Sequence, residues 1–268
     1  MAFPDITLTS LETITAFDIA SGDFLFMLDE LQSASLQQSE ETVDITGKQG
    51  RRLNSLKRNK AVTVSGTNGL VSGGMLAVQS GSDEGFVHSA EALVRWTDYI
   101  TVGDSGLATT YVAEGAVGAE IAGLYAKESN GTLGTKYTQV ASSPSAGEFT
   151  YDPTTKAITF GGTAPAKGTE FVAFYNREIE ADVLENDSGK YARKCALYID
   201  AFGEDKCANI YRVQIYIPQA DFNGNFTFDM GDNQTVHSFE ANALAGACGS
   251  SGLYWTFTVY GETEEDGD

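Results

Sequence analysis

The sequence predicts a mainly β protein with at most one or two short helices. Residues 211–217 alternate apolar side chains with Arg212 and Gln214, the period-two pattern of a half-buried strand. Asn-Gly pairs at 68–69, 130–131 and 223–224 supply turns, because both residue types tolerate positive φ. With 268 residues and 42% hydrophobic content, the chain is long enough for one large β domain or two smaller ones.

The first hundred residues hold two strand signals and one predicted helix. Residues 22–31 fit either a helical stripe or an alternating strand, and we favour a strand because Phe24 and Phe26 suit a pleated surface. Residues 61–65 are rich in β-branched side chains and predict a second strand. We place a short helix around Ser89 to Trp96.

The later strands follow the same logic. Residues 149–151 and 158–160 flank a turn that begins at Asp152-Pro153, which predicts a hairpin. Residues 171–175 form a short aromatic strand. Residues 211–217 end at Pro218, which cannot donate a hydrogen bond to a sheet, and 255–259 alternate again.

A change in composition predicts the domain organisation. Residues 101–175 are rich in Gly, Ser, Thr and Ala, and 176–190 form a polar connection. We therefore expect a main β domain whose halves are residues 1–100 and 179–268, with a small β domain inserted at 101–178. One continuous, elaborated sandwich is the alternative. The last eight residues carry five acids and predict a solvated C-terminal end.

The charge balance excludes several classes of protein. The chain holds 37 acidic and 17 basic residues, a formal charge of -20, which disfavours general binding to nucleic acid or anionic lipid. We find no apolar run long enough to span a membrane and no secretory signal at the start. Cys195, Cys207 and Cys248 match no zinc motif and predict free thiols in a reducing cytoplasm, although a Cys195–Cys207 disulfide remains an alternative.

The search for chemistry predicts no catalytic, cofactor-binding or metal-binding residues. Residues 103–106 read Gly-Asp-Ser-Gly with His88 upstream, but the short separation leaves no room for the sheet that orients a catalytic triad, so a polar turn is favoured. Asp221, Asn223 and Asn225 lack the glycine and glutamate positions of a calcium loop and predict a hairpin tip. We therefore expect a protein that is not an enzyme.

The most distinctive local feature is a basic segment at 48–60, KQGRRLNSLKRNK, which contains no acid. It leaves a balance of -26 on the other residues, so contact with an acidic surface of another copy suits it. Nucleic-acid binding is disfavoured because the segment has no aromatic residue. A solvated loop is the alternative. Its basic residues are the candidate inter-subunit seam: Lys48, Arg51, Arg52, Lys57, Arg58 and Lys60.

Most of the chain resembles the tail tube, or major tail, proteins of long-tailed bacteriophages. The resemblance rests on an early apolar strand at 24–31, a second strand at 35–46 and a long basic loop opened by TGKQG. A strand at 60–65 and the turn SGTNG follow. The middle segment EFTYDPTTKAITFGGTAPAKGTEFVAFY is similar to strand-rich modules of phage structural proteins, and residues from 190 onward are similar to their closing strands.

The resemblance implies a β-sandwich or half-barrel protomer with an inserted small, Ig-like module. It also implies homo-hexameric rings stacked into a hollow, negatively lined tube, through which DNA passes without specific binding. The basic loop would bridge to neighbouring protomers or to the next ring, and the other partners would be further tail proteins. The protein would be made in the host cytoplasm and reside in the virion tail. Alternatives are a capsid decoration, tail terminator or baseplate protein, or a β-sandwich module that binds carbohydrate or a cell surface.

Overall fold

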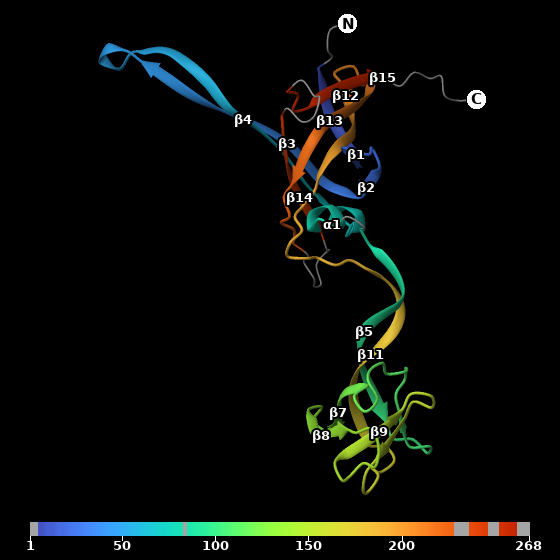
Figure 1. The fold of residues 1–268 in the computed structure, drawn as a ribbon. Coiled ribbons are helices and arrows are strands. Elements are labelled where there is room, and N and C mark those ends of the chain that lie inside the picture. The colour runs from blue at the N-terminus through green and yellow to red at the C-terminus, as the bar shows by residue number, and fades with distance from the viewer. Residues whose placement is uncertain (1–4, 83–84, 228–235, 246–251, 262–268) are drawn as a thin grey trace, which may run out of the picture. The chain divides into compact units, whose positions relative to one another are not determined.

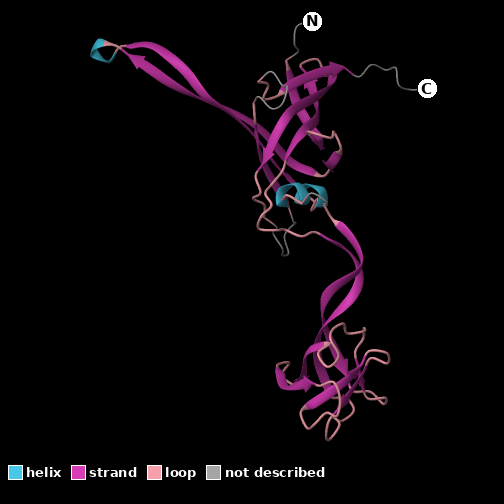
Figure 2. Cartoon of the chain, in the orientation of Figure 1, coloured by secondary structure: helices cyan, strands magenta, loops and turns pink. Residues whose placement is uncertain are grey.

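The computed structural model describes residues 5–82, 85–227, 236–245 and 252–261. It confirms the mainly β fold class. Contacts divide the chain into two compact units: unit 1, Met1–Phe86 with Leu184–Asp268, and unit 2, Val87–Val183 (Figures 1 and 2). Cys248 and the acidic residues 262–268 lie outside the described residues, so the expectations for them stay predictions.

Unit 1 contains an eight-stranded antiparallel sheet that curls into a half-barrel. Its order is β2-β1-β12-β13-β14-β4-β3, and β15 pairs with β13 beside that path. The strands are β1 (Ile6–Asp18), β2 (Phe24–Leu28), β3 (Leu31–Thr46), β4 (Arg52–Asn68), β12 (Lys194–Asp205), β13 (Ile210–Phe222), β14 (His237–Ala243) and β15 (Thr256–Gly261). Residues 22–31 thus contain a strand, as the aromatic pattern predicted.

The core of unit 1 follows from strand alternation. Ile14 and Ala16 of β1 and Leu197 and Ile199 of β12 point to one face, where they are at most 5% exposed. Cys195 is buried in the same cluster as a free thiol, and burial raises its pKa to about 12. Cys207 is also free, so the alternative of a disulfide between the two is wrong.

The helix of unit 1 is α1, Gly73–Ser80, which packs against β2. The Ser72 hydroxyl caps its first turn by accepting a hydrogen bond from the Met75 amide, and Gly81 ends it at φ 74°. The predicted helix at Ser89 to Trp96 is wrong, because those residues belong to a strand. Their backbone pairs with a segment far away in the chain, and short local patterns do not reveal such pairing.

Unit 2 holds a seven-stranded sheet in the order β5-β11-β7-β8-β9-β10-β6. Its strands are β5 (Val87–Thr101), β6 (Leu107–Ala108), β7 (Ile121–Lys127), β8 (Leu133–Gln139), β9 (Glu148–Asp152), β10 (Ala157–Phe160) and β11 (Glu170–Val183). β9 and β10 form the hairpin that the Asp152-Pro153 turn predicted. A separate core surrounds the buried side chains of Leu124, Phe149 and Phe171.

The boundaries of unit 2 lie outside the predicted insertion of residues 101–178. β5 pairs with β11 in an antiparallel ladder from Glu170–Thr101 to Val183–Val87. Both strands therefore belong to unit 2 over their full length. The composition changes only near residue 101, whereas the ladder begins at Val87. The composition therefore marks where the Gly-, Ser-, Thr- and Ala-rich segment begins, and it misses the paired part of β5 and β11 that comes before that segment.

Candidate functional site: a projecting β-hairpin

The candidate seam lies on the hairpin formed by β3 and β4. The strands pair along almost their whole length, from Leu31–Asn68 to Thr46–Arg52. The inner part of β4 also pairs with β14, at residues 63–68. Beyond it the two strands pair only with each other and run out of the sheet as a ribbon (Figure 1). We call residues 40–60 the arm.

The predicted basic loop is therefore mostly strand. Only Gly47, a single turn of 3-10 helix, η1 (Lys48–Gly50), and Arg51 separate β3 from β4. Gln49 and Gly50 adopt positive φ of 64° and 73°, which closes the ribbon tightly. A segment that contains turn-forming residues and no apolar run is read as a long loop. Here the strand continues through the charged residues, and because these side chains are polar, their alternation between the two faces of the strand does not show in the sequence.

A β-bulge separates the arm from the inner hairpin. Ser39 pairs with Ala61 and Glu41 with Arg58, so β4 carries one extra residue at this point. Asn59 supplies it with φ 52°, a left-handed conformation that asparagine tolerates better than most residues. Its side-chain amide donates a 2.6 Å hydrogen bond to Glu41 Oε2. The bulge is thus formed by Asn59, and the hydrogen bond from its side chain to Glu41 holds it in place.

Three of the six basic residues are paired within the arm. Arg52 lies 2.9 Å from Asp44, Arg58 lies 2.9 Å from Glu41, and Lys57 contacts Glu40. The hydrogen bonds from Arg58 and Asn59 hold the pKa of Glu41 below its usual range. The acids come from β3, outside the basic segment, so the sequence alone did not show them. Because water screens such exposed pairs, each of them contributes little to the stability of the hairpin.

The other three basic residues differ in their surroundings. Lys60 sits over the ring of Tyr254, with its Nζ 5.6 Å from the ring centroid. Lys48 and Arg51, at the tip, have no ion pair or side-chain hydrogen bond with any described residue. The hairpin therefore presents two uncompensated cations at its end, and these two are the strongest of the candidate seam residues.

The arm also carries an apolar stripe that the sequence analysis missed. Val43 pairs directly with Leu56, and Ile45 follows two positions later on the same face of β3. Ile45 is 42% exposed and Leu56 53% exposed, and Leu53 near the tip is 68% exposed. Period-two reading of residues 41–46 would have found the stripe.

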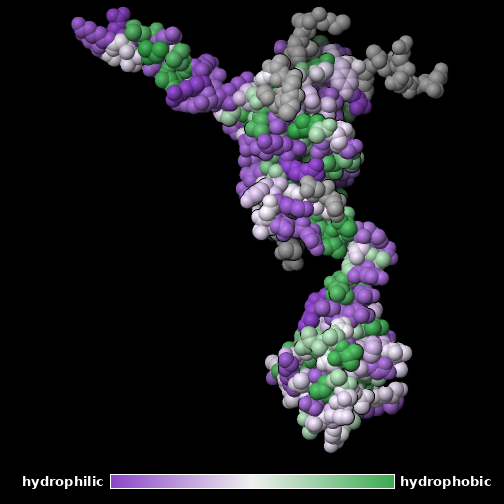
Figure 3. All heavy atoms as spheres, viewed as in Figure 1, coloured by the Kyte–Doolittle hydropathy of each residue, from purple (hydrophilic) through white to green (hydrophobic). Residues whose placement is uncertain are grey.

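The stripe faces away from the side that continues the core. On β3 the core-facing residues Ala34 and Leu36 are at even positions, whereas Val43 and Ile45 are at odd positions. β3 itself gains no residue between them, so the two sets point to opposite faces. The arm therefore exposes apolar surface that its own core cannot cover. Figure 3 shows hydrophobic side chains on the arm between hydrophilic ones.

The structure shows where the residues of the motifs that were set aside lie. His88 Nδ1 lies 2.9 Å from Asp182, near the start of β5. Gly103 and Gly106 form a tight turn beyond the end of β5, so His88 and Ser105 lie about 40 Å apart along the strand. Asn223 accepts a hydrogen bond from the amide of Asn225 in the turn after β13. Among the described residues, no three His, Cys, Asp or Glu side chains are placed to hold a metal ion.

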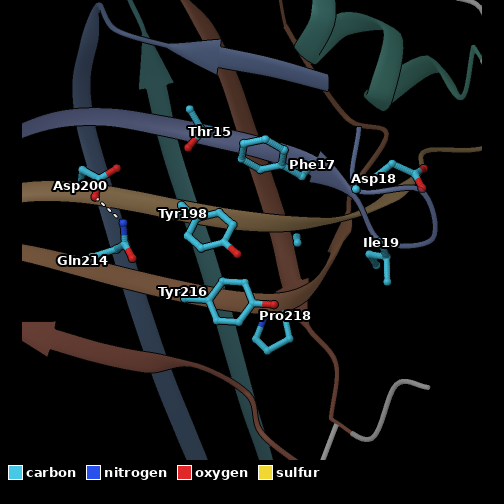
Figure 4. A pocket seen from close by; sticks show the side chains of 11 residues that line it. Thr15, Phe17, Asp18, Ile19, Tyr198, Asp200, Gln214, Tyr216 and Pro218 are labelled. Atoms are coloured by element: carbon cyan, nitrogen blue, oxygen red, sulfur yellow. Dashed lines mark hydrogen bonds between the residues drawn. The ribbon is translucent and has the colours of Figure 1, made fainter. Parts of the chain in front are cut away.

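A pocket of about 550 Å³ lies on the face of the sheet opposite the core (Figure 4). Phe17, Tyr198 and Tyr216 cross it side by side, with the two tyrosine rings stacked 4.6 Å apart. Gln214 donates a 2.9 Å hydrogen bond to Asp200. Burial raises the pKa of Tyr216 above its ordinary value. The described lining contains no histidine or cysteine, and its Asp18 pairs with Arg193 outside the pocket.

Comparison with known proteins supplies one match. Residues 7–257 match the model of the YomU/Tube protein family. No curated protein matches significantly. Among the described residues, none of the helices has the length and apolar character needed to cross a membrane.

Proposed function

The chain belongs to the YomU/Tube protein family, and we propose from this premise that it assembles with itself into the tube of a phage tail. The match covers nearly the whole chain and confirms the resemblance to tail tube proteins. The protein is thus a structural tail tube component. Homo-hexameric rings, their stacking, and the passage of DNA are the finer parts of the proposal, as are the absence of enzymatic activity, contacts with other tail proteins and residence in the virion tail.

The arm carries the proposal. A two-stranded ribbon is marginal in water on its own, yet this one extends past the sheet with an apolar stripe and unpaired cations. Burying one Leu or Ile side chain fully contributes about 1.5–3 kcal/mol, so a partner that covers the stripe gains several such terms. When one surface of a subunit binds a different surface of the next copy, the same contact can repeat from copy to copy. The subunits then form a closed ring or an open filament.

The distribution of charge between the arm and the rest of the chain supports a tube through which DNA passes. The arm holds six basic and three acidic residues, a formal charge of +3, so the rest of the chain sums to -23 within the total of -20. A wall that carries negative charge repels phosphate, and DNA slides along it instead of binding. We infer that the cations of the arm are buried in contacts between subunits, while surplus acid lines the lumen.

The first prediction tests the arm. We expect Lys48→Glu with Arg51→Glu to leave the monomer folded and to lower tube yield by more than about tenfold, because the unpaired cations become anions within an acidic protein. Arg52 is left unchanged because Asp44 pairs with it. Negative-stain electron microscopy and sedimentation measure the tubes, and averaged end views test the six-fold symmetry.

The matched control is Lys190→Glu with Lys194→Glu, which changes the net charge equally at exposed positions of unit 1 outside the arm that form no ion pair with the described residues. We expect tubes from this control. Equal yields from both double variants would remove the arm tip from the seam.

A further inference from the structure

A second apolar surface of unit 1 lies beside α1. A groove of about 360 Å³ runs between α1 and β2, and we call it the α1 groove. Its wall includes Phe24, Leu25, Gly73, Ala77, Val78 and Phe86. Gly74 lets the helix lie directly on β2, since a Cβ there would stand 2.7 Å from the Leu25 carbonyl oxygen. The groove is therefore built by close packing of two ordered elements.

The groove exposes large apolar side chains. Phe24 is 60% exposed and Phe86 is 44% exposed. Leu70 and Val71, which precede the groove residue Gly73 by three and two positions in the chain, are also exposed. Figure 3 shows hydrophobic side chains beside α1. Clustered apolar surface of this kind on a soluble protein marks an interaction site more often than scattered single residues do.

The chain's own arm cannot reach this groove. The arm lies at the N-terminal end of β4, and Asn68 at the other end leads into α1. Leu56 and Asn68 are separated by about 40 Å at roughly 3.3 Å per residue, and the paired strand between them is extended. The apolar stripe and the groove of one molecule thus stay apart, so an arm that occupies the groove comes from another molecule.

Charges on the two surfaces are complementary. Asp23 precedes the groove residue Phe24, and Asp29 and Glu30 follow β2. All three are exposed, and their carboxylates have no ion pair with the described residues. The cation in the groove wall, Arg193, is neutralised by Asp18 at 2.8 Å. The Gly69 amide donates a 2.8 Å hydrogen bond to the Glu30 carbonyl oxygen, so Asp29 and Glu30 lie at the turn that holds Leu70. The apolar surface beside α1 therefore has unpaired acids at both ends of β2, and we call Asp23, Asp29 and Glu30 the acidic rim. The arm carries apolar surface with a basic tip.

We propose that the α1 groove receives the arm of a second copy of this chain. The stripe of Val43, Ile45 and Leu56 packs against the groove, and Lys48 and Arg51 meet the acidic rim. The inference rests on the proposed assembly through the arm and adds the partner surface. Because each copy has one arm and one groove, the contact is heterologous and each docked copy offers a free arm for the next.

A charge exchange tests the pairing. Asp29→Lys with Glu30→Lys alone is expected to lower tube yield by more than about tenfold, as the arm variant does. Combining it with Lys48→Glu and Arg51→Glu restores the complementary charges, and we expect yield within about twofold of the unchanged protein. The control combines the same arm variant with Glu12→Lys and Glu204→Lys, exposed acids on β1 and β12, and does not restore tubes.

Cross-linking separates this inference from the proposed function. In a Cys207→Ser, Cys248→Ser background, Ile45→Cys and Leu70→Cys are placed in one chain and tubes are oxidised mildly. We expect disulfide-linked chains from tubes and none from dilute monomer or from either single variant. Normal tubes without cross-links and without charge rescue overturn the groove assignment and leave the arm in the seam. Failure of the unchanged protein to form tubes overturns both.

Discussion

His237 joins α1 to the sheet of unit 1 through its imidazole ring. The ring is fully buried, its Nδ1 accepts a 3.3 Å hydrogen bond from the Ser72 amide, and Nε2 lies 2.8 Å from Gln79 Oε1. An acceptor at Nδ1 and a donor at Nε2 require the neutral ring. Burial lowers the pKa of His237. The neutral histidine therefore stabilises the packing of the helix that forms one wall of the α1 groove.

We expect acid to destabilise unit 1 through this residue. The folded pKa lies below the unfolded value near 6.5, so the unfolded chain binds the proton more readily as pH falls through that range. The loss is at most about 1.4 kcal/mol per pH unit and ends below the folded pKa. Urea unfolding at pH 7.5 and 5.5 measures it. The free energy of unfolding of the His237→Gln variant should depend less on pH. The same pH dependence in the variant and in the unchanged protein would contradict this role of His237.

At the scale of elements, the bulge at Asn59 decides on which face of the arm the apolar residue of β4 lies. On β3 the change from Ala34 and Leu36 to Val43 and Ile45 is in the sequence, and the extra residue on β4 brings Leu56 opposite Val43, so both strands place apolar side chains on the same face. The hydrogen bond from Asn59 to Glu41 holds this geometry. A bulge of this kind aims a side-chain set toward a partner without altering the sheet from which the arm grows.

We expect Asn59→Val to impair assembly more than Asn59→Gly. Valine strains the left-handed backbone by about 1–2 kcal/mol and favours a regular ladder, which would turn Leu56 away from the face that carries Val43 and Ile45. Glycine keeps the conformation and loses only the contact with Glu41. Sedimentation measures tube yield, with the thermal transition of the monomer as a check on folding. Equal assembly of the two variants would show that the bulge does not set the interface.

On the scale of the whole molecule, the chain forms two units with separate cores. One core surrounds Ile14, Leu197 and Ile217, and the other surrounds Leu124, Phe149 and Phe171. β5 and β11 bring the two ends of unit 2 together, since Val87 pairs with Val183. An insertion whose ends meet interrupts its host with little entropic cost for closing the host chain.

Replacing residues 87–183 with a short Gly-Ser linker should therefore preserve the thermal transition of unit 1. The arm and the α1 groove both lie in unit 1, so we also expect the shortened protein to assemble. Differential scanning calorimetry measures the transition, and electron microscopy measures the tubes. Loss of all folding would show that the two units depend on each other for stability.

Local signals in the sequence account for much of the agreement between the predicted strands and the strands of the structure. The alternation at 211–217, the turn at Asp152-Pro153 and the aromatic pattern at 24–28 each lie within one strand or hairpin, so short windows reveal them. The helix was misplaced because Ser89 to Trp96 pair with β11, about eighty residues away in the chain. The boundaries of unit 2 were displaced because the same ladder begins before the composition changes.

The sequence by itself determined the β fold class, the acidic balance and the basic cluster at 48–60, because these depend on composition and local period. Only the tertiary structure decided which cations are paired, since Asp44, Glu40 and Glu41 reach them across the hairpin. It also decided that Lys48 and Arg51 are left over and that the apolar stripe turns away from the core. Pairing between strands is a non-local property, and one extra residue at Asn59 changes its outcome.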